Sequence, residues 1–293
     1  MALVDVTSKH PLALNSPLRY PGGKSRLAGF FGDIFDELAL RHVTYVEPFA
    51  GGAGAGLTLL IRGRVDKVVI NDLDPAVYSF WSSVRNENHE FVQRIQSVPL
   101  TLDEWERQRA IYKAADSSDP FRLGFAFFYL NRTNRSGILH AGVIGGRSQT
   151  ARDRIDARFP RAELVKRVQK IGQLADQIEL TFTDGRKVVQ QWAERPDTFL
   201  YVDPPYVQAG GSLYLNAFDH RDHTMLAAAM NQVAAERWLL TYDDAPLVRR
   251  LYEDRGVFDF ELHYSAHRVG RARELLIASD PLRHFIDRRR AGE

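Results

Sequence analysis

The stretch VTYVEPFAGGAGAGLTLLIRGRVDKVVIND, residues 43–72, decides the predicted fold. A β-rich apolar run leads into a turn with four glycines, an apolar run of helical character follows, and a second apolar strand ends at Asp72. Glycines between a strand and a helix allow a tight turn and let the backbone approach a ligand closely. The segment therefore predicts a strand–helix–strand unit with a ligand site at its glycine turn.

Strand and helix patterns also alternate on both sides of this unit, which predicts an α/β protein with a mostly parallel sheet. Apolar residues recur at helical spacing before it, across 24–40, and directly after it, across 75–86. Further strands are predicted at 177–184, 198–203, 237–244, 258–266 and 272–279, with helices at 220–236 and 245–254. We expect the last residues, 283–293, to form a frayed basic tail.

The region from 87 to 175 interrupts the alternation. Helical patterns occupy its first half, including the aromatic run FAFFYL at 125–130, which we expect in the core, and a long polar stretch with glycines follows. We therefore expect a main domain formed by residues 1–86 and 176–293, with residues 87–175 inserted as a largely helical subdomain.

The composition limits the function classes that remain. The 293-residue chain is 44% apolar and 26% charged, as is ordinary for a globular protein with a sizeable core. It has no cysteine, which excludes disulfides, thiolate metal sites and cysteine nucleophiles. No apolar run approaches the length of a membrane span and the first residues do not have the pattern of a secretory signal, so we expect a cytoplasmic protein without a membrane partner.

Charge is unevenly distributed although the net charge is only +2. Residues 122–170 hold eleven Lys or Arg against three Asp or Glu, so the remainder of the chain carries a net charge of about −6. A compact basic segment is typical of a surface that binds phosphates, although charge alone is equally compatible with a solvated face. The basic stretch that would follow a phosphate backbone contains Arg147, Arg152, Arg154 and Arg158.

A second stretch, TFLYVDPPYV at 198–207, carries the predicted chemistry. Two consecutive prolines cannot continue a sheet ladder, so the chain leaves the sheet at the carboxyl end of the strand, where open α/β sheets bind ligands. Asp203 and the Pro204 carbonyl are two acceptors that suit an amino group, and Tyr206 offers a ring on which a planar base can stack. The alternative is a Pro-Pro turn that only closes a strand.

Two further elements suggest a nucleoside-like ligand. Asp72 follows Gly51 by twenty-one residues, a spacing that suits a carboxylate accepting hydrogen bonds from ribose hydroxyls. This pair alone is equally compatible with a dinucleotide site, or the glycines form a plain turn. The Gly-Lys-Ser at 23–25 is not a phosphate loop, because Leu18 stands where that motif needs a glycine. We therefore interpret this segment as a polar glycine turn that contains Tyr20 and Lys24 and could close over a ligand.

Taken together, the motifs resemble those of the Dam-type DNA adenine-N6 methyltransferases. The matching segments, in order, are PLRYPGGKSRL, YVEPFAGGAGAGL, VVINDLDP, FYLNRTNRSGI, LTFTDG and YVDPPY, followed by HTMLAAAM, WLLTY and RARELLIAS. The resemblance implies a Rossmann-like class I methyltransferase sheet, mostly parallel with an antiparallel last strand. It also implies that the insert before the tetrapeptide recognises the target.

The resemblance implies a role for each matching residue. The implied cofactor is S-adenosylmethionine, without a metal, held by Tyr20, Lys24, Glu47, Phe49, Gly51, Asp72 and Asp184. The implied catalytic residues are Asp203, Pro204, Pro205 and Tyr206. The implied nucleic-acid contacts are Asn131, Arg132, Asn134 and Arg135.

The implied reaction is a direct in-line methyl transfer to the N6 amine of an adenine flipped out of double-stranded DNA, at a specific site. A cognate restriction endonuclease that acts separately would then be one kind of partner. Two alternatives stay open at this point. The same site also suits an amine in RNA, in cytosine or on a protein glutamine, and the chain could instead bind DNA without turnover. His220 and His223 flank Asp222, and we assign them to a helix start in preference to a metal site.

Overall fold

The computed structural model describes residues 3–7, 15–19, 24–208, 218–233, 237–264 and 270–291, and it is organised around a seven-stranded sheet. The strands are β1 (Thr44–Glu47), β2 (Lys67–Asn71), β3 (Ile178–Thr181), β4 (Thr198–Val202), β5 (Trp238–Asp243), β6 (Gly256–Tyr264) and β7 (Gly270–Ala278). The helices include a short 3-10 turn η1 (Lys24–Arg26), α1 (Leu27–Glu37), α2 (Gly54–Ile61), α3 (Pro75–Asn86), α4 (Asn88–Ser97), α5 (Leu102–Ala114), α6 (Pro120–Thr133), α7 (Arg161–Gly172), α8 (Gly185–Trp192), α10 (His220–Gln232), α11 (Pro246–Leu251) and α12 (Asp280–Ala291).

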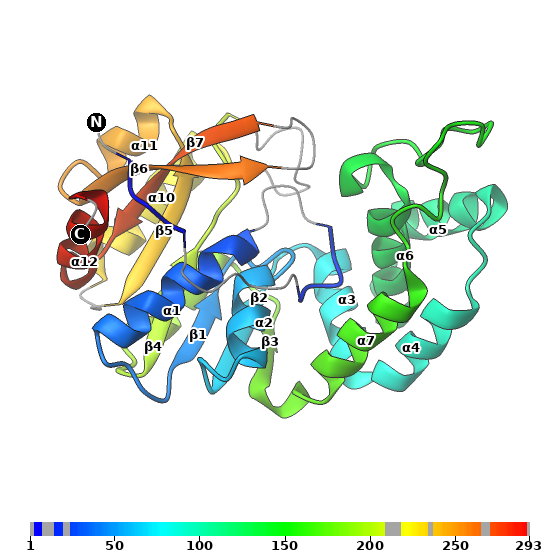
Figure 1. The fold of residues 1–293 in the computed structure, drawn as a ribbon, viewed down its shortest axis with the longest axis horizontal. Coiled ribbons are helices and arrows are strands. Elements are labelled where there is room, and N and C mark those ends of the chain that lie inside the picture. Colours follow the sequence, from blue (N-terminus) through cyan, green and yellow to red (C-terminus); the bar gives the residue numbers. More distant parts are fainter. Residues whose placement is uncertain are drawn as a thin grey trace.

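The strand order is β3-β2-β1-β4-β5-β7-β6 (Figure 1). β1 pairs in parallel with β2 and β4, β2 with β3, and β4 with β5, whereas β7 is antiparallel to both β5 and β6. This arrangement confirms the predicted mostly parallel sheet with an antiparallel last strand. The order reverses between β1 and β4, and the carboxyl ends of strands beside such a point are where open α/β sheets bind ligands.

The strand–helix–strand unit predicted from residues 43–72 is present as β1, α2 and β2. All four residues of β1 are buried, because helices cover both faces of the sheet and such strands need apolar residues throughout. The register pairs Glu47 with Ile70, and Val46 with Leu200. Because the three strands are parallel, the segments that follow them emerge at the same edge of the sheet.

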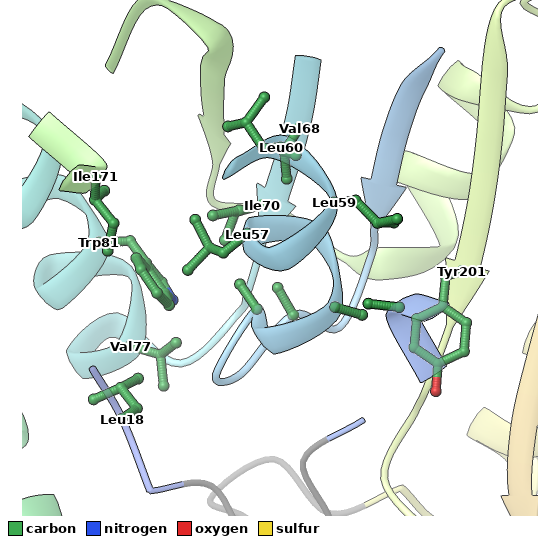
Figure 2. Packing of buried hydrophobic residues seen from close by; sticks show 14 of the residues in the cluster. Leu18, Leu57, Leu59, Leu60, Val68, Ile70, Val77, Trp81, Ile171 and Tyr201 are labelled. Atoms are coloured by element: carbon green, nitrogen blue, oxygen red, sulfur yellow. The ribbon is translucent and has the colours of Figure 1, made fainter. Parts of the chain in front are cut away.

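Each face of the sheet has its own apolar core. Tyr45, Phe199 and Tyr201 pack under α1 and α2 on one face, whereas α8, α10 and α11 cover the other face. Figure 2 shows Leu57 of α2, Ile70 of β2 and Trp81 of α3 lying together on the first face. This core continues into the insert without a break, since Phe91, Phe125 and Phe128 belong to the same cluster.

The insert forms α4 to α7, which group beside α3 on one side of the sheet (Figure 1). Its aromatic run is buried as predicted, on α6. α6 crosses α3 closely at Gly124, where a Cβ would lie 2.6 Å from the backbone of Ser79 and Phe80. Only glycine permits that approach. The sequence prediction did not identify α7, which lies in the polar second half of the insert.

The predicted frayed tail is wrong, because residues 280–291 form the helix α12. Leu282, Phe285 and Ile286 recur at helical spacing and are buried, so the helix packs one apolar stripe on the molecule. Arg288 and Arg289 pair with Glu37 and Asp33 of α1. The density of basic residues concealed this stripe in the sequence. Within the described ranges, none of the helices combines the length and apolarity needed to cross a membrane.

Candidate active site

The glycine turn after β1 is held by Asp72. The Gly51 N–H donates to one Asp72 carboxylate oxygen at 2.9 Å, and the Asp74 N–H donates to the other at 2.9 Å. The Trp81 indole N–H donates to the Gly51 carbonyl at 2.9 Å. Gly51 has φ of +46°, a conformation that suits glycine. Burial raises the pKa of Asp72 to about 6, although the backbone donors lower it.

Glu47, the last residue of β1, lies beneath the same turn. Its side chain is 5% exposed and accepts a hydrogen bond from the Gly56 N–H at 2.9 Å, within the first turn of α2. Burial raises the pKa of Glu47 to about 8, because the charged form loses its hydration. The first turn of α2 follows Ala53, which is in the left-handed region and provides no side-chain cap. The helix start therefore presents backbone N–H groups toward this edge.

Asp203 lies one residue beyond β4 and is fixed by two neighbours. The Thr241 hydroxyl on β5 donates to one of its carboxylate oxygens at 2.7 Å, and Tyr201 contacts that hydroxyl at 2.8 Å. The Lys24 ammonium lies 3.3 Å from the other oxygen. The Asp203 side chain nevertheless remains 24% exposed. A carboxylate accepts up to about four hydrogen bonds, so lone pairs remain for a ligand.

The two prolines turn the chain so that Tyr206 folds back beside Lys24. The Lys24 ammonium donates to the Tyr206 hydroxyl at 2.6 Å and lies 5.0 Å from the ring centroid. The Tyr206 hydroxyl donates to Glu274 on β7 at 2.8 Å. After Tyr206, the backbone N–H groups of Val207 and Gln208 both donate to Asp243. The conformation of the tetrapeptide is therefore fixed from both sides.

Phe49 and Asp184 are brought together at the ends of β1 and β3. A Cβ on Gly185 would lie 2.5 Å from the Phe49 ring, so this glycine lets the two loops meet. The Asp184 carboxylate caps α8 by accepting from the Arg186 N–H and pairs with the Arg186 guanidinium, which lowers its pKa. Leu73 and Phe182, which are 46% and 49% exposed, leave apolar surface at the ends of β2 and β3.

The N-terminal segment reaches this edge through residues 15–19. The Ser16 hydroxyl donates to the Gly52 carbonyl at 2.6 Å. The Arg19 N–H donates to the Asn131 amide oxygen at 2.8 Å, and the Asn131 amide N–H donates back to the Arg19 carbonyl at 2.9 Å. Tyr20, predicted as a cofactor contact, lies outside the described residues. Lys24, four residues further on, lies beside Asp203 and Tyr206.

The insert residues predicted to contact DNA differ strongly in exposure. Asn131 and Asn134 are 2% and 0% exposed, and their amides bond to the protein itself. The Asn134 amide accepts from the Trp105 indole N–H and donates to the Ile138 and Leu139 carbonyls. Arg135 is exposed. The two asparagines thus hold the loop that carries Arg135.

Arg132 is 8% exposed, and its Nε has no hydrogen-bond partner among the described residues. Burial, together with the charges of Arg19, Arg167 and Arg158, lowers the pKa of Arg132 to about 9. Arg158 and Arg167 also pair with Asp153 and Glu163, which offsets part of this positive charge.

His220 and His223 lie in the first turn of α10, at the helix start that the sequence predicted. Asp219 and Asp222 form a capping box, and His223 is buried with its Nδ1 2.8 Å from the Tyr242 hydroxyl. Among the described residues, no cluster of His, Cys, Asp and Glu could hold a metal ion.

The sequence prediction missed Thr241 and Glu274. Both belong to predicted strands, 237–244 and 272–279, within the quoted segments WLLTY and RARELLIAS. A polar or charged residue inside an otherwise apolar strand is the sequence signal that could have identified Thr241 and Glu274. A buried polar side chain needs a partner, and here both contact the residues around Asp203.

Comparisons with known proteins identify the family. A sequence model described as D12 class N6 adenine-specific DNA methyltransferase matches residues 20–271. The chain is 24% identical over 207 residues to the Type II methyltransferase M.MjaIII of Methanocaldococcus jannaschii, which covers 64% of this chain and 68% of that protein. It is 23% identical over 248 residues to the DNA adenine methylase of Escherichia coli strain K12, which covers 80% of this chain and 83% of that protein.

A solved structure, the rRNA methyltransferase aviRa from Streptomyces viridochromogenes, aligns over 94% of this chain and 90% of its own. Its TM-score is 0.37 at 12% identity, too low to establish a shared fold.

Proposed function

The chain belongs to the D12 class of N6 adenine-specific DNA methyltransferases, and on that basis we propose that Asp203 and the Pro204 carbonyl hold the target amine during transfer. The enzyme methylates adenine in DNA. The observation that carries the proposal is the position of Asp203: it is partly exposed, its carboxylate is fixed by Thr241 and Lys24, and it lies at the sheet edge that Asp72 shares. Two fixed acceptors orient an amine without the cost of reorganising at the moment of reaction.

Residues at the neighbouring strand ends fit S-adenosylmethionine. Asp72 is a carboxylate that can accept from two ribose hydroxyls while it holds the turn. The start of α2 follows Ala53, which provides no side-chain cap, and the backbone N–H groups that Glu47 leaves free there suit the methionine carboxylate. The exposed apolar surface beside Asp184 and Phe49 suits the adenine ring. When bound, the cofactor supplies a methyl group on a positively charged sulfur.

The chain's own residues then position the acceptor. The target adenine leaves the duplex, because its amine cannot reach a buried strand end while stacked. Tyr206 provides a ring for stacking, Pro205 restricts the backbone between ring and acceptors, and Asp203 aligns the lone pair of the amine. Such a direct in-line transfer needs positioning and electrostatics, and no covalent intermediate with the protein.

We propose that residues 87–175 recognise DNA as an insert in a catalytic domain of residues 1–86 and 176–293. Arg135 is exposed, and Arg152 and Arg154 are exposed without an ion pair to any described carboxylate. Arg132 is buried among Arg19, Arg158 and Arg167, so its charge would act on a phosphate by adding to the local positive field. Asn131 and Asn134 act in this proposal by shaping the loop.

A restriction–modification context is part of the proposal. It is supported by the name of the relative from Methanocaldococcus jannaschii, a Type II methyltransferase. In that setting, a separate endonuclease would cut the same sequence when it is unmethylated.

Methyl transfer to defined substrates tests the assignment. The protein is incubated with tritiated S-adenosylmethionine and unmethylated plasmid DNA, total RNA or a protein extract, and the product is digested to nucleosides or amino acids. We expect label in N6-methyldeoxyadenosine from DNA. Label only in RNA, in a methylated cytosine or in protein would overturn the choice of substrate.

A further inference from the structure

Glu274 is a buried carboxylate in the middle of an antiparallel strand, where a charge is costly unless it is paired. It lies on β7, between β5 and β6, with 3% exposure. By strand alternation it faces opposite to Arg273, which pairs with Asp259. The side chain accepts from the Tyr206 hydroxyl at 2.8 Å and lies 3.5 Å from the Lys24 ammonium.

Lys24 connects Glu274 to the tetrapeptide. Its ammonium is 2.6 Å from the Tyr206 hydroxyl and 3.3 Å from Asp203, and its side chain is only 4% exposed. One ammonium therefore faces two carboxylates and a phenol, and among the charged groups only Asp203 is partly exposed. Shifting any one of these groups changes the position of the others, because the network is buried and its members share donors.

We propose that Glu274 is a positioning residue for methyl transfer, which holds the Tyr206 phenol and the Lys24 ammonium so that Asp203 keeps the orientation in which it accepts from the target amine. Glu274 acts through Tyr206 and Lys24 and does not itself contact the substrate. This inference rests on the proposed role of Asp203 and Tyr206.

The ionised form of Glu274 is the form that performs this task. Burial raises the pKa of Glu274 to about 7, with Lys24 opposing and Asp203 adding to the increase. The other titratable groups facing it within the described residues are Tyr206 and Tyr201, with Asp243 as its register partner on β5. As the pH falls through about 7, Glu274 takes up a proton and its hold on Lys24 weakens.

The test compares Glu274→Gln with the unmodified protein in single-turnover methyl transfer to plasmid DNA, from pH 6 to pH 9. Glutamine keeps the shape and an acceptor for Tyr206 but removes the charge. We expect the transfer rate to fall about ten- to hundredfold at pH 8, the range for losing one charge-assisted hydrogen bond. The unmodified protein should lose activity as the pH falls below about 7, whereas Glu274→Gln should lack the part of that limb centred near 7 and keep only a part at lower pH, where Asp72 titrates. Binding of S-adenosylmethionine should change less than the rate.

Two further variants separate the possible outcomes. Asp259→Asn removes another buried, ion-paired carboxylate from the neighbouring strand β6, so it controls for lost stability, and it should retain the acidic limb. Asp203→Ala tests the proposed function itself. If Asp203→Ala loses transfer while Glu274→Gln keeps both its rate and the part of the acidic limb centred near 7, the positioning role is wrong and the proposed function stands. If Asp203→Ala transfers methyl groups at an unchanged rate, the proposed role of Asp203 is wrong, and the inference about Glu274 that rests on it is overturned as well.

Discussion

Asp72 holds the glycine turn, and in the proposed function the same side chain also binds a ligand. Its two oxygens accept from the Gly51 and Asp74 N–H groups, which closes the glycine turn against β2. The same carboxylate has capacity for further donors. Burial raises the pKa of Asp72 to about 6, although backbone N–H groups stabilise its ionised form. Donors from ribose hydroxyls would stabilise that form further.

Replacing Asp72 with alanine should weaken S-adenosylmethionine binding about ten- to hundredfold, the effect of losing hydrogen bonds to a charged group. Asp74→Ala is the matched control, because Asp74 caps α3 in the same turn and its loss should cost about 1 kcal/mol of stability. Calorimetric titration of both variants measures the difference. Equal loss of affinity in the two would mean that Asp72 only supports the turn.

Among the elements, the contact between α6 and the N-terminal segment has the clearest consequence. Asn131 on α6 brackets Arg19 with one donated and one accepted hydrogen bond and also donates to the Gly137 carbonyl. A Cβ on Gly137 would lie 2.4 Å from the Arg19 carbonyl oxygen, so the loop after α6 closes tightly on the same residue. Because Arg19 is five residues before Lys24, the insert helps to position the segment that enters the active site.

Asn131→Ala should therefore destabilise the protein by about 1–3 kcal/mol, since it leaves buried backbone groups without partners. It should also raise the KM for S-adenosylmethionine more than the KM for DNA. Urea unfolding and steady-state kinetics measure these effects, with the exposed neighbour Arg135→Ala as the control, which should affect DNA alone. An Asn131→Ala protein with unchanged stability and weakened DNA binding would instead support a direct contact to DNA.

The sequence predicted the elements that are regular and missed those that depend on tertiary contacts. The strand–helix–strand unit is encoded locally by a β-rich run, a glycine turn and an acid at the end of the next strand, so it was confirmed. α12 was missed because its three apolar positions are surrounded by arginines that pair with α1, far away in the sequence. Glu274 was missed because its role exists only where β7 lies next to the tetrapeptide.

At the scale of the whole molecule, the basic insert and the sheet share a continuous apolar core. A DNA-binding surface on the insert, as proposed, would therefore be tied rigidly to the strand ends. The sequence predicted the excess of positive charge in the insert. In the structure this charge is largely exposed, as at Arg152 and Arg154. Arg132 is the exception, since it is buried. The sequence alone does not reveal which arginine of a basic segment is buried.

Affinity for DNA should depend steeply on salt, because bound phosphates release counterions. Each of Arg152→Ala and Arg154→Ala should lower the slope of log affinity against log salt by about 1, without a change in S-adenosylmethionine affinity. Arg62→Ala, at the exposed end of α2, is the control and should leave the slope unchanged. Fluorescence anisotropy with a labelled duplex gives the slopes. Unaltered slopes in both insert variants would exclude these residues from the interface.

The proposed transfer depends most on Asp203, whose carboxylate is fixed by Thr241 and Lys24 at the shared strand ends. The most direct measurement is single-turnover methyl transfer by Asp203→Ala at saturating DNA and S-adenosylmethionine, alongside titration of cofactor binding. We expect the transfer rate to fall by at least about a hundredfold, as for removal of a preorganised group that acts in the transition state, with cofactor affinity retained within about threefold. Transfer at a rate close to that of the unmodified protein would contradict the assignment of Asp203 as the acceptor for the adenine amine.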